Sequence, residues 1–141
     1  MNLGVRLVWG LVACSPLLVG CGGRADGFER VRVRGNVAFG DEPIAEGELR
    51  FVPIKGTVAP VAGALIADGL YEVTNKGGVP VGTYRVEIMG YRELPKDPGD
   101  DLEIEAREQY VPAEFNERSN LEVVVEKGAT SMRQDFQLTK P

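Results

Sequence analysis

The sequence contains no histidine, and this absence removes several kinds of chemistry. Histidine is the commonest general base near neutral pH, a frequent zinc ligand and a member of every Ser-His-Asp and Cys-His arrangement. Positive charge is not in excess either, because 16 Lys and Arg residues against 21 Asp and Glu residues give a net charge of −5. Since nucleic-acid binding depends on Lys and Arg contacts to phosphate, this balance argues against a nucleic-acid partner.

Cysteine and tryptophan are scarce as well. The chain has two cysteines, Cys14 and Cys21, and one tryptophan, Trp9, and all three precede residue 22. The remaining chain therefore has no disulfide, and its stability must come from packing. Its aromatic residues are four tyrosines and five phenylalanines, so broad aromatic binding platforms are sparse.

One long apolar run is present, Leu7–Val19, after a short polar start that carries Arg6. As a helix the run would span roughly 20 Å, which is short for a hydrocarbon core of about 30 Å. This length favours a cleaved signal peptide over a permanent span. The run closes on a lipobox, at which a bacterial signal peptidase cuts before a lipid-modified cysteine: Leu18, Val19, Gly20 and Cys21.

The lipobox predicts a signal peptide over 1–20, a lipidated cysteine with a glycine-rich flexible tether over 21–28, and one domain over 29–141. A lipid on Cys21, with palmitate among its acyl chains, would hold the protein on the outside of the cytoplasmic membrane or in the outer membrane. Two alternatives stay open. The box Leu11-Val12-Ala13-Cys14 also fits but leaves a shorter apolar core, and an ordinary secretory signal or anchor helix can contain a cysteine by chance.

From residue 29 onward apolar and polar residues alternate with a period of two, which is typical of strands with one buried face. Asp68-Gly69 is a strong hairpin signal, and Gly and Pro punctuate the other connections. In the clearest strand Tyr84 supplies a large ring for the core, with a hydroxyl that needs a partner. The alternation predicts seven strands, over 31–39, 47–53, 61–67, 71–74, 83–91, 121–125 and 132–138.

Three patches carry a resemblance to a known family. They are Val33-x-Gly35-x-Val37 with the following Gly47–Pro53, then Asp68-Gly69-Leu70-Tyr71, then Pro80–Val86. In this order the chain resembles the transthyretin-like, carboxypeptidase-regulatory-like domains of small bacterial lipoproteins, planctomycete ones especially. The resemblance implies an all-β fold, a seven-stranded antiparallel Greek-key β-sandwich, and no particular activity.

One enzyme group with the transthyretin fold, the hydroxyisourate hydrolases, has a cleft lined by histidine and arginine and closed by a C-terminal Tyr-Arg-Gly-Ser. This chain ends in Gln137–Pro141 and has no residues to carry that site. Because these residues are missing, we expect the protein not to be an enzyme.

The segment 92–119 between two predicted strands is long and rich in acids, and acidic oxygens are the ligands that Ca²⁺ prefers. The spacing of a calcium loop is missing, however, so we expect neither a metal nor a cofactor. We expect instead a short helix capped by Asp100, with a Glu103–Arg107 pair. An acid–base pair of carboxylates is the remaining interpretation. Among the acids of this segment are Asp97, Asp100, Asp101, Glu103, Glu105 and Glu108.

These observations favour a non-catalytic lipoprotein of the cell envelope, acting as a structural or protein-interaction module. The alternative is a module that binds envelope polysaccharide, for which Tyr91 and Tyr110 are the best ligand-binding candidates because they flank the long segment. Three arginines of the first strand, Arg30, Arg32 and Arg34, form a basic row. We expect this row to pair with acids such as Glu48 or Glu87; contact with anionic headgroups or cell-wall polymer is the alternative.

Overall fold

The computed structural model describes residues 26–95 and 106–140. The signal peptide and the lipobox with Cys21 lie outside the described residues, and so do Asp97, Asp100, Asp101, Glu103 and Glu105 of the long segment.

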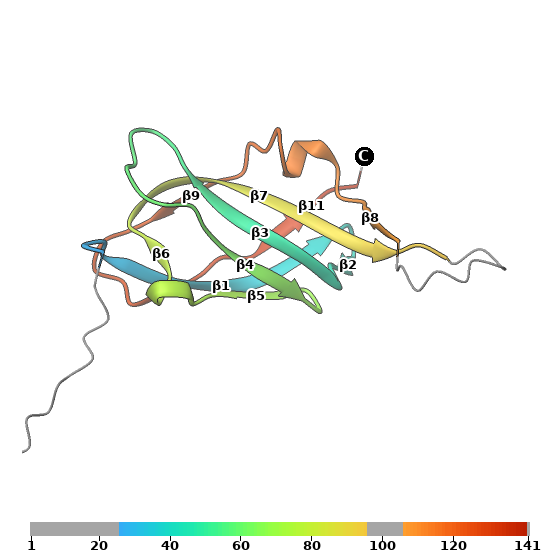
Figure 1. The fold of residues 1–141 in the computed structure, drawn as a ribbon, viewed down its shortest axis with the longest axis horizontal. Helices are drawn as coiled ribbons and strands as arrows, with labels where there is room; N and C mark the ends of the chain where they lie inside the picture. The colour runs from blue at the N-terminus through green and yellow to red at the C-terminus, as the bar shows by residue number, and fades with distance from the viewer. Residues whose placement is uncertain (1–25, 96–105, 141) are drawn as a thin grey trace, which may run out of the picture.

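Within the described residues the fold is all-β, and its only helical elements are two single 3₁₀ turns, η1 and η2 (Figure 1). The elements follow in the order β1 Arg30–Phe39, β2 Glu42–Pro43, β3 Glu46–Pro53, β4 Ala62–Ala67, β5 Leu70–Val73, η1 Asn75–Gly77, β6 Val79–Pro80, β7 Gly82–Glu93, β8 Arg107–Gln109, η2 Ala113–Phe115, β9 Glu122–Val125, β10 Ser131–Arg133 and β11 Phe136–Leu138.

The strands form a curled sheet in the order β10-β1-β5-β4-β3-β7-β8, with β9 also on β7 and with β2, β6 and β11 also on β1. All pairings are antiparallel except those of β10 and β11 with β1. The sheet curls at the β4–β5 hairpin, because β4 pairs with β3 along its whole length but with β5 only at Ile66 and Ala67. The two halves of the sheet then face one another (Figure 1).

All seven predicted segments contain strands, and the last one is divided into β10 and β11. The division has a local cause at Gln134 and Asp135. The Asp135 carboxylate accepts a hydrogen bond from the Asn36 backbone N–H at 2.8 Å, and the Gln134 N–H donates to the Arg34 carbonyl at 2.9 Å. A side chain thus replaces part of the ladder on β1, and the Asn36 N–H holds the pKa of Asp135 below its ordinary value.

The core lies between the two halves of the sheet. The inward positions of the predicted alternation are fully buried, among them Val31, Val33, Leu49 and Phe51. The Tyr84 ring is fully buried too, and its hydroxyl donates to the Pro80 carbonyl at 2.8 Å. The hydroxyl that the sequence analysis said needs a partner therefore has one.

Tyr84→Phe is expected to lower the free energy of unfolding by about 0.5–1.5 kcal/mol. The variant keeps the ring but leaves the Pro80 carbonyl without its donor. Urea unfolding followed by far-UV circular dichroism measures the difference. A variant as stable as the wild type would show that this bond contributes nothing.

The buried phenol of Tyr71 is expected to make the fold sensitive to alkali. Burial, followed by the nearby Asp135 charge, raises the pKa of Tyr71 above its ordinary value of 10.0, and its hydroxyl donates to the Gln134 carbonyl at 2.7 Å. Above about pH 10 the unfolded chain releases this proton while the folded chain keeps it, so stability falls as pH rises.

The Tyr71→Phe variant, which has no proton to release there, is expected to lose less stability than the wild type on going from pH 9 to pH 11. Urea unfolding at a series of pH values gives both curves. Parallel curves would contradict the assignment.

Candidate functional site

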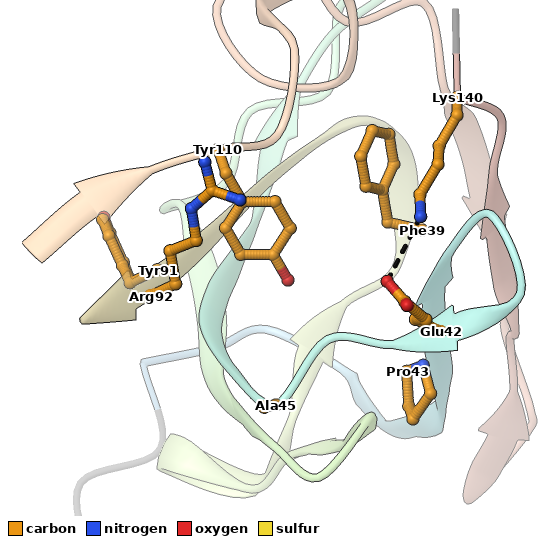
Figure 2. Close-up of a pocket in the computed structure, with 8 residues that line it drawn as sticks. All are labelled: Phe39, Glu42, Pro43, Ala45, Tyr91, Arg92, Tyr110 and Lys140. Atoms are coloured by element: carbon orange, nitrogen blue, oxygen red, sulfur yellow. Dashed lines mark hydrogen bonds and ion pairs between the residues drawn. The ribbon is translucent and has the colours of Figure 1, made fainter. Parts of the chain in front are cut away.

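A pocket of about 360 Å³ opens at the end of the curled sheet where β1 finishes and β7 pairs with β8 (Figure 2). This end is opposite to the one where β1 begins (Figure 1). The pocket is lined by Phe39, Glu42, Pro43, Ala45, Tyr91, Arg92, Tyr110 and Lys140.

Strand pairing places Tyr110 in this pocket. β8 pairs with the last residues of β7, and the Tyr110 N–H donates to the Gly90 carbonyl at 3.0 Å. A Cβ added to Gly90 would lie 3.0 Å from Cζ of Tyr110 and 2.9 Å from a methyl carbon of Val111. Glycine at this position therefore lets the tyrosine ring lie directly on the strand.

Two aromatic rings and two cations form the walls of the pocket. The Phe39 and Tyr110 rings are 6.0 Å apart between centroids and inclined at 55°. The Arg92 guanidinium lies 5.6 Å from the Tyr110 centroid, and the Lys140 ammonium lies 5.7 Å from the Phe39 centroid. Each cation is thus held over the face of a ring, which favours one arrangement of its side chain.

Each cation also has one carboxylate partner. Arg92 bonds through Nε and one terminal nitrogen to Glu108 Oε2, at 2.8 and 2.7 Å, and Lys140 lies 3.2 Å from Glu42 Oε2. All four side chains are well exposed, so these ion pairs contribute little to stability. Their effect is to fix the positions of charges at the rim.

The Tyr110 hydroxyl points toward the middle of the pocket in Figure 2. Burial raises the pKa of this phenol, and the Glu42 charge adds to the rise, while the charges of Arg92 and Lys140 oppose it. The group therefore stays protonated near neutral pH. No hydrogen bond joins it to another described residue, so it is free to donate or accept.

The two predicted ligand-binding residues, Tyr91 and Tyr110, line the same pocket but are not used alike. The Tyr91 ring points away from the Tyr110 ring (Figure 2), and its hydroxyl contacts the Met89 sulfur at 3.7 Å. The ring that accompanies Tyr110 is instead that of Phe39, which the sequence analysis missed. The available signal was that Phe39 ends a strand, where an inward side chain reaches the open end of the core.

The predicted short helix in the acidic segment is wrong where the structure describes it. Arg107–Gln109 is strand β8, and Arg107 pairs with Glu46 at 2.5 Å, so no helix includes these residues; Glu103, its predicted partner, lies outside the described residues. The physical reason is that β7 extends to Glu93 and offers a free edge to which β8 bonds. Asp100, the predicted cap, lies outside the described residues.

Within residues 26–95 and 106–140 no group of three His, Cys, Asp or Glu residues could hold a metal ion. Glu108, an acid of the long segment that the structure describes, is paired with Arg92.

The basic row has different partners from those predicted. Arg32 lies 3.8 Å from Glu72, while Arg30 is turned inward, pairs with Asp26 and donates to the Gly78 carbonyl at 3.0 Å. The predicted partner Glu87 is taken by two arginines of other strands, Arg50 at 3.3 Å and Arg85 at 2.6 Å.

No helix in the described part of the chain is long and apolar enough to cross a membrane.

Comparison with known proteins adds no family to this geometry. No protein-family model and no curated protein matches the chain. Among solved structures, a 9R-lipoxygenase from Cyanothece PCC8801 matches at 17% sequence identity with a TM-score of 0.34. The match covers 79% of this chain and 16% of the lipoxygenase, and a similarity this low carries no argument about fold or activity.

Proposed function

We propose that the protein is a non-catalytic lipoprotein of the cell envelope, anchored through a lipid on Cys21 and acting as a structural or protein-interaction module. The lipobox Leu18-Val19-Gly20-Cys21 at the end of an apolar run supports the anchor. Cleavage before Cys21 leaves a tether over 21–28 and a domain over 29–141. Such a protein lies on the outside of the cytoplasmic membrane or in the outer membrane.

The observation that carries the proposal is the direction of β1. The described chain begins at Asp26, beside the start of β1, and β1 ends at Phe39 in the pocket. At about 3.3 Å per residue the strand spans roughly 30 Å. An anchor at Cys21 therefore holds one end of the domain near the bilayer and presents the pocket at the far end.

Cell fractionation tests the anchor. We expect the wild type in the membrane fraction and the Cys21→Ala variant outside it, while the Cys14→Ala control stays with the membrane. If Cys14→Ala is released and Cys21→Ala is not, the alternative lipobox Leu11-Val12-Ala13-Cys14 carries the anchor. Release of the wild type into the soluble fraction would remove the proposal.

The absence of catalysis is supported by the chemistry of the described acids. With no histidine in the chain, a hydrolase would depend on paired carboxylates. Glu42, Glu87 and Glu108 are each held by a lysine or arginine. Each of these carboxylates is therefore already bonded to a cation of the protein.

For the fold we propose the transthyretin-like, seven-stranded Greek-key sandwich. The Tyr84 hydroxyl donates to a carbonyl four residues upstream, the arrangement of the tyrosine corner found in Greek-key sandwiches. The two facing halves of the sheet support the same architecture. An experimental structure in which β4 and β5 belong to a single open sheet would contradict it.

A second candidate function, binding of envelope polysaccharide, is favoured by the composition of the pocket. Carbohydrate sites combine an aromatic surface for the apolar sugar face with fixed polar groups for its hydroxyls. Here the Phe39 and Tyr110 rings lie beside Arg92, Lys140 and Glu42. A glycan array probed with the full chain in detergent tests the idea. Tyr110→Ala is expected to lose binding, while Tyr91→Ala keeps it, because the Tyr91 ring points away from the Tyr110 ring. Absence of glycan binding by the wild type would contradict this second candidate function.

A further inference from the structure

We infer that the pocket binds a saccharide residue that carries a carboxylate, a uronic acid unit within an envelope polymer; this rests on the second candidate function. The first argument is charge. The chain has a net charge of −5, yet the two cations of the pocket lining, Arg92 and Lys140, balance the two carboxylates that hold them, Glu108 and Glu42. The charge at the pocket is therefore less negative than that of the molecule as a whole, and an anionic ligand meets less repulsion here.

The second argument is the number of unused donors. Arg92 has five N–H donors, of which Glu108 takes two, and Lys140 has three, of which Glu42 takes one. The Tyr110 hydroxyl points into the same space (Figure 2). A ligand with many acceptor oxygens can bond to these groups without displacing either ion pair. A carboxylate gains most, because charge-assisted hydrogen bonds are the stronger ones.

The third argument is shape. The inclined Phe39 and Tyr110 rings supply an apolar wall between the two cations, against which the C–H face of a pyranose can pack. The volume of about 360 Å³ lies in the range typical of small-ligand pockets, roughly 300–1,000 Å³. The side chains of Arg92 and Lys140 are 61% and 50% exposed, so solvent screens their charges and binding must depend on salt.

The test is titration calorimetry of the full chain in detergent with an oligogalacturonate, using the same oligomer as its methyl ester for comparison. The two probes share ring and hydroxyl geometry and differ in charge. We expect the acid to bind about tenfold more tightly than the ester, the effect of one charge-assisted contact. Its affinity should fall as salt rises from about 50 to about 300 mM.

Variants separate the contributions. Arg92→Gln and Lys140→Gln are each expected to weaken binding of the acid several-fold and to leave binding of the ester unchanged. Tyr91→Phe, which keeps the ring and removes only the hydroxyl that contacts the Met89 sulfur, is the matched control and should bind as the wild type does. Urea unfolding of each variant verifies that it folds.

The outcomes distinguish failure of this inference from failure of the second candidate function, polysaccharide binding, on which it rests. Equal affinity for the acid and the ester overturns the assignment of an acidic ligand but leaves polysaccharide binding in place. Binding of neither probe, together with a silent glycan array, overturns both. A preference for the acid that survives in both glutamine variants would place the anionic site elsewhere and contradict the inference.

Discussion

Phe51→Ala is expected to lower the free energy of unfolding by about 3–5 kcal/mol, the usual cost of removing a buried phenylalanine ring. Phe51 is fully buried on β3, and its ring meets the Tyr84 ring edge-on at 6.1 Å between centroids. The cavity left behind would lie between the two halves of the sheet, where close packing prevents its collapse. With a typical domain stability of about 5–15 kcal/mol, the variant would retain a small margin.

Chemical denaturation followed by far-UV circular dichroism measures the loss. Val124→Ala on β9 is the control, because its side chain is 52% exposed and points away from the core. A surface change of this kind is expected to cost about 0.5 kcal/mol or less. Equal costs for the two variants would show that the halves of the sheet do not enclose a common core.

Gly35→Ala is the second change with a large expected effect, about 3 kcal/mol, at the upper end of what overpacking costs. A Cβ on this residue would lie 1.9 Å from the Gln134 carbonyl oxygen, so the connection between β10 and β11, Gln134 and Asp135, would have to move. That movement would break the bond from the Tyr71 hydroxyl to the same carbonyl and the bond from Asn36 to Asp135.

A double-mutant cycle tests this mechanism. Because Gly35→Ala already disrupts the Tyr71 bond to Gln134, the cost of Gly35→Ala should be smaller in a Tyr71→Phe background than in the wild type. Strictly additive changes in the free energy of unfolding would indicate that the alanine is accommodated without moving the connection between β10 and β11.

The long strands could be predicted because their signal is local. In β1 and β7 the apolar residues alternate over enough positions to define both the strand and its buried face. The short strands β2, β6 and β8 were not predicted, because two or three residues carry no period. These short strands form where the fold places them beside the edge of a longer strand, β1 or β7, and the sequence does not show which strand that is.

The candidate site was predicted in part. The Tyr110 ring packs beside Phe39 in the pocket, whereas the Tyr91 ring is turned away from the Tyr110 ring. The alternation of inward and outward residues along β7 explains this difference. Tyr84, Val86 and Ile88 face the core, so the odd-numbered position of Tyr91 lies on the outer face of β7. Phe39, Lys140 and Glu42 come from distant parts of the chain and meet only through the fold, so their proximity could not be read from the sequence.

The account depends most on the lipid at Cys21, and intact-mass analysis with metabolic labelling tests it directly. Cells grown with an alkyne analogue of palmitate should label the wild-type protein, and its first residue should be a diacylglyceryl-modified Cys21. The Cys21→Ala variant should stay unlabelled. An unlabelled wild-type protein, or one whose Cys21 is a free thiol, would contradict the anchored arrangement.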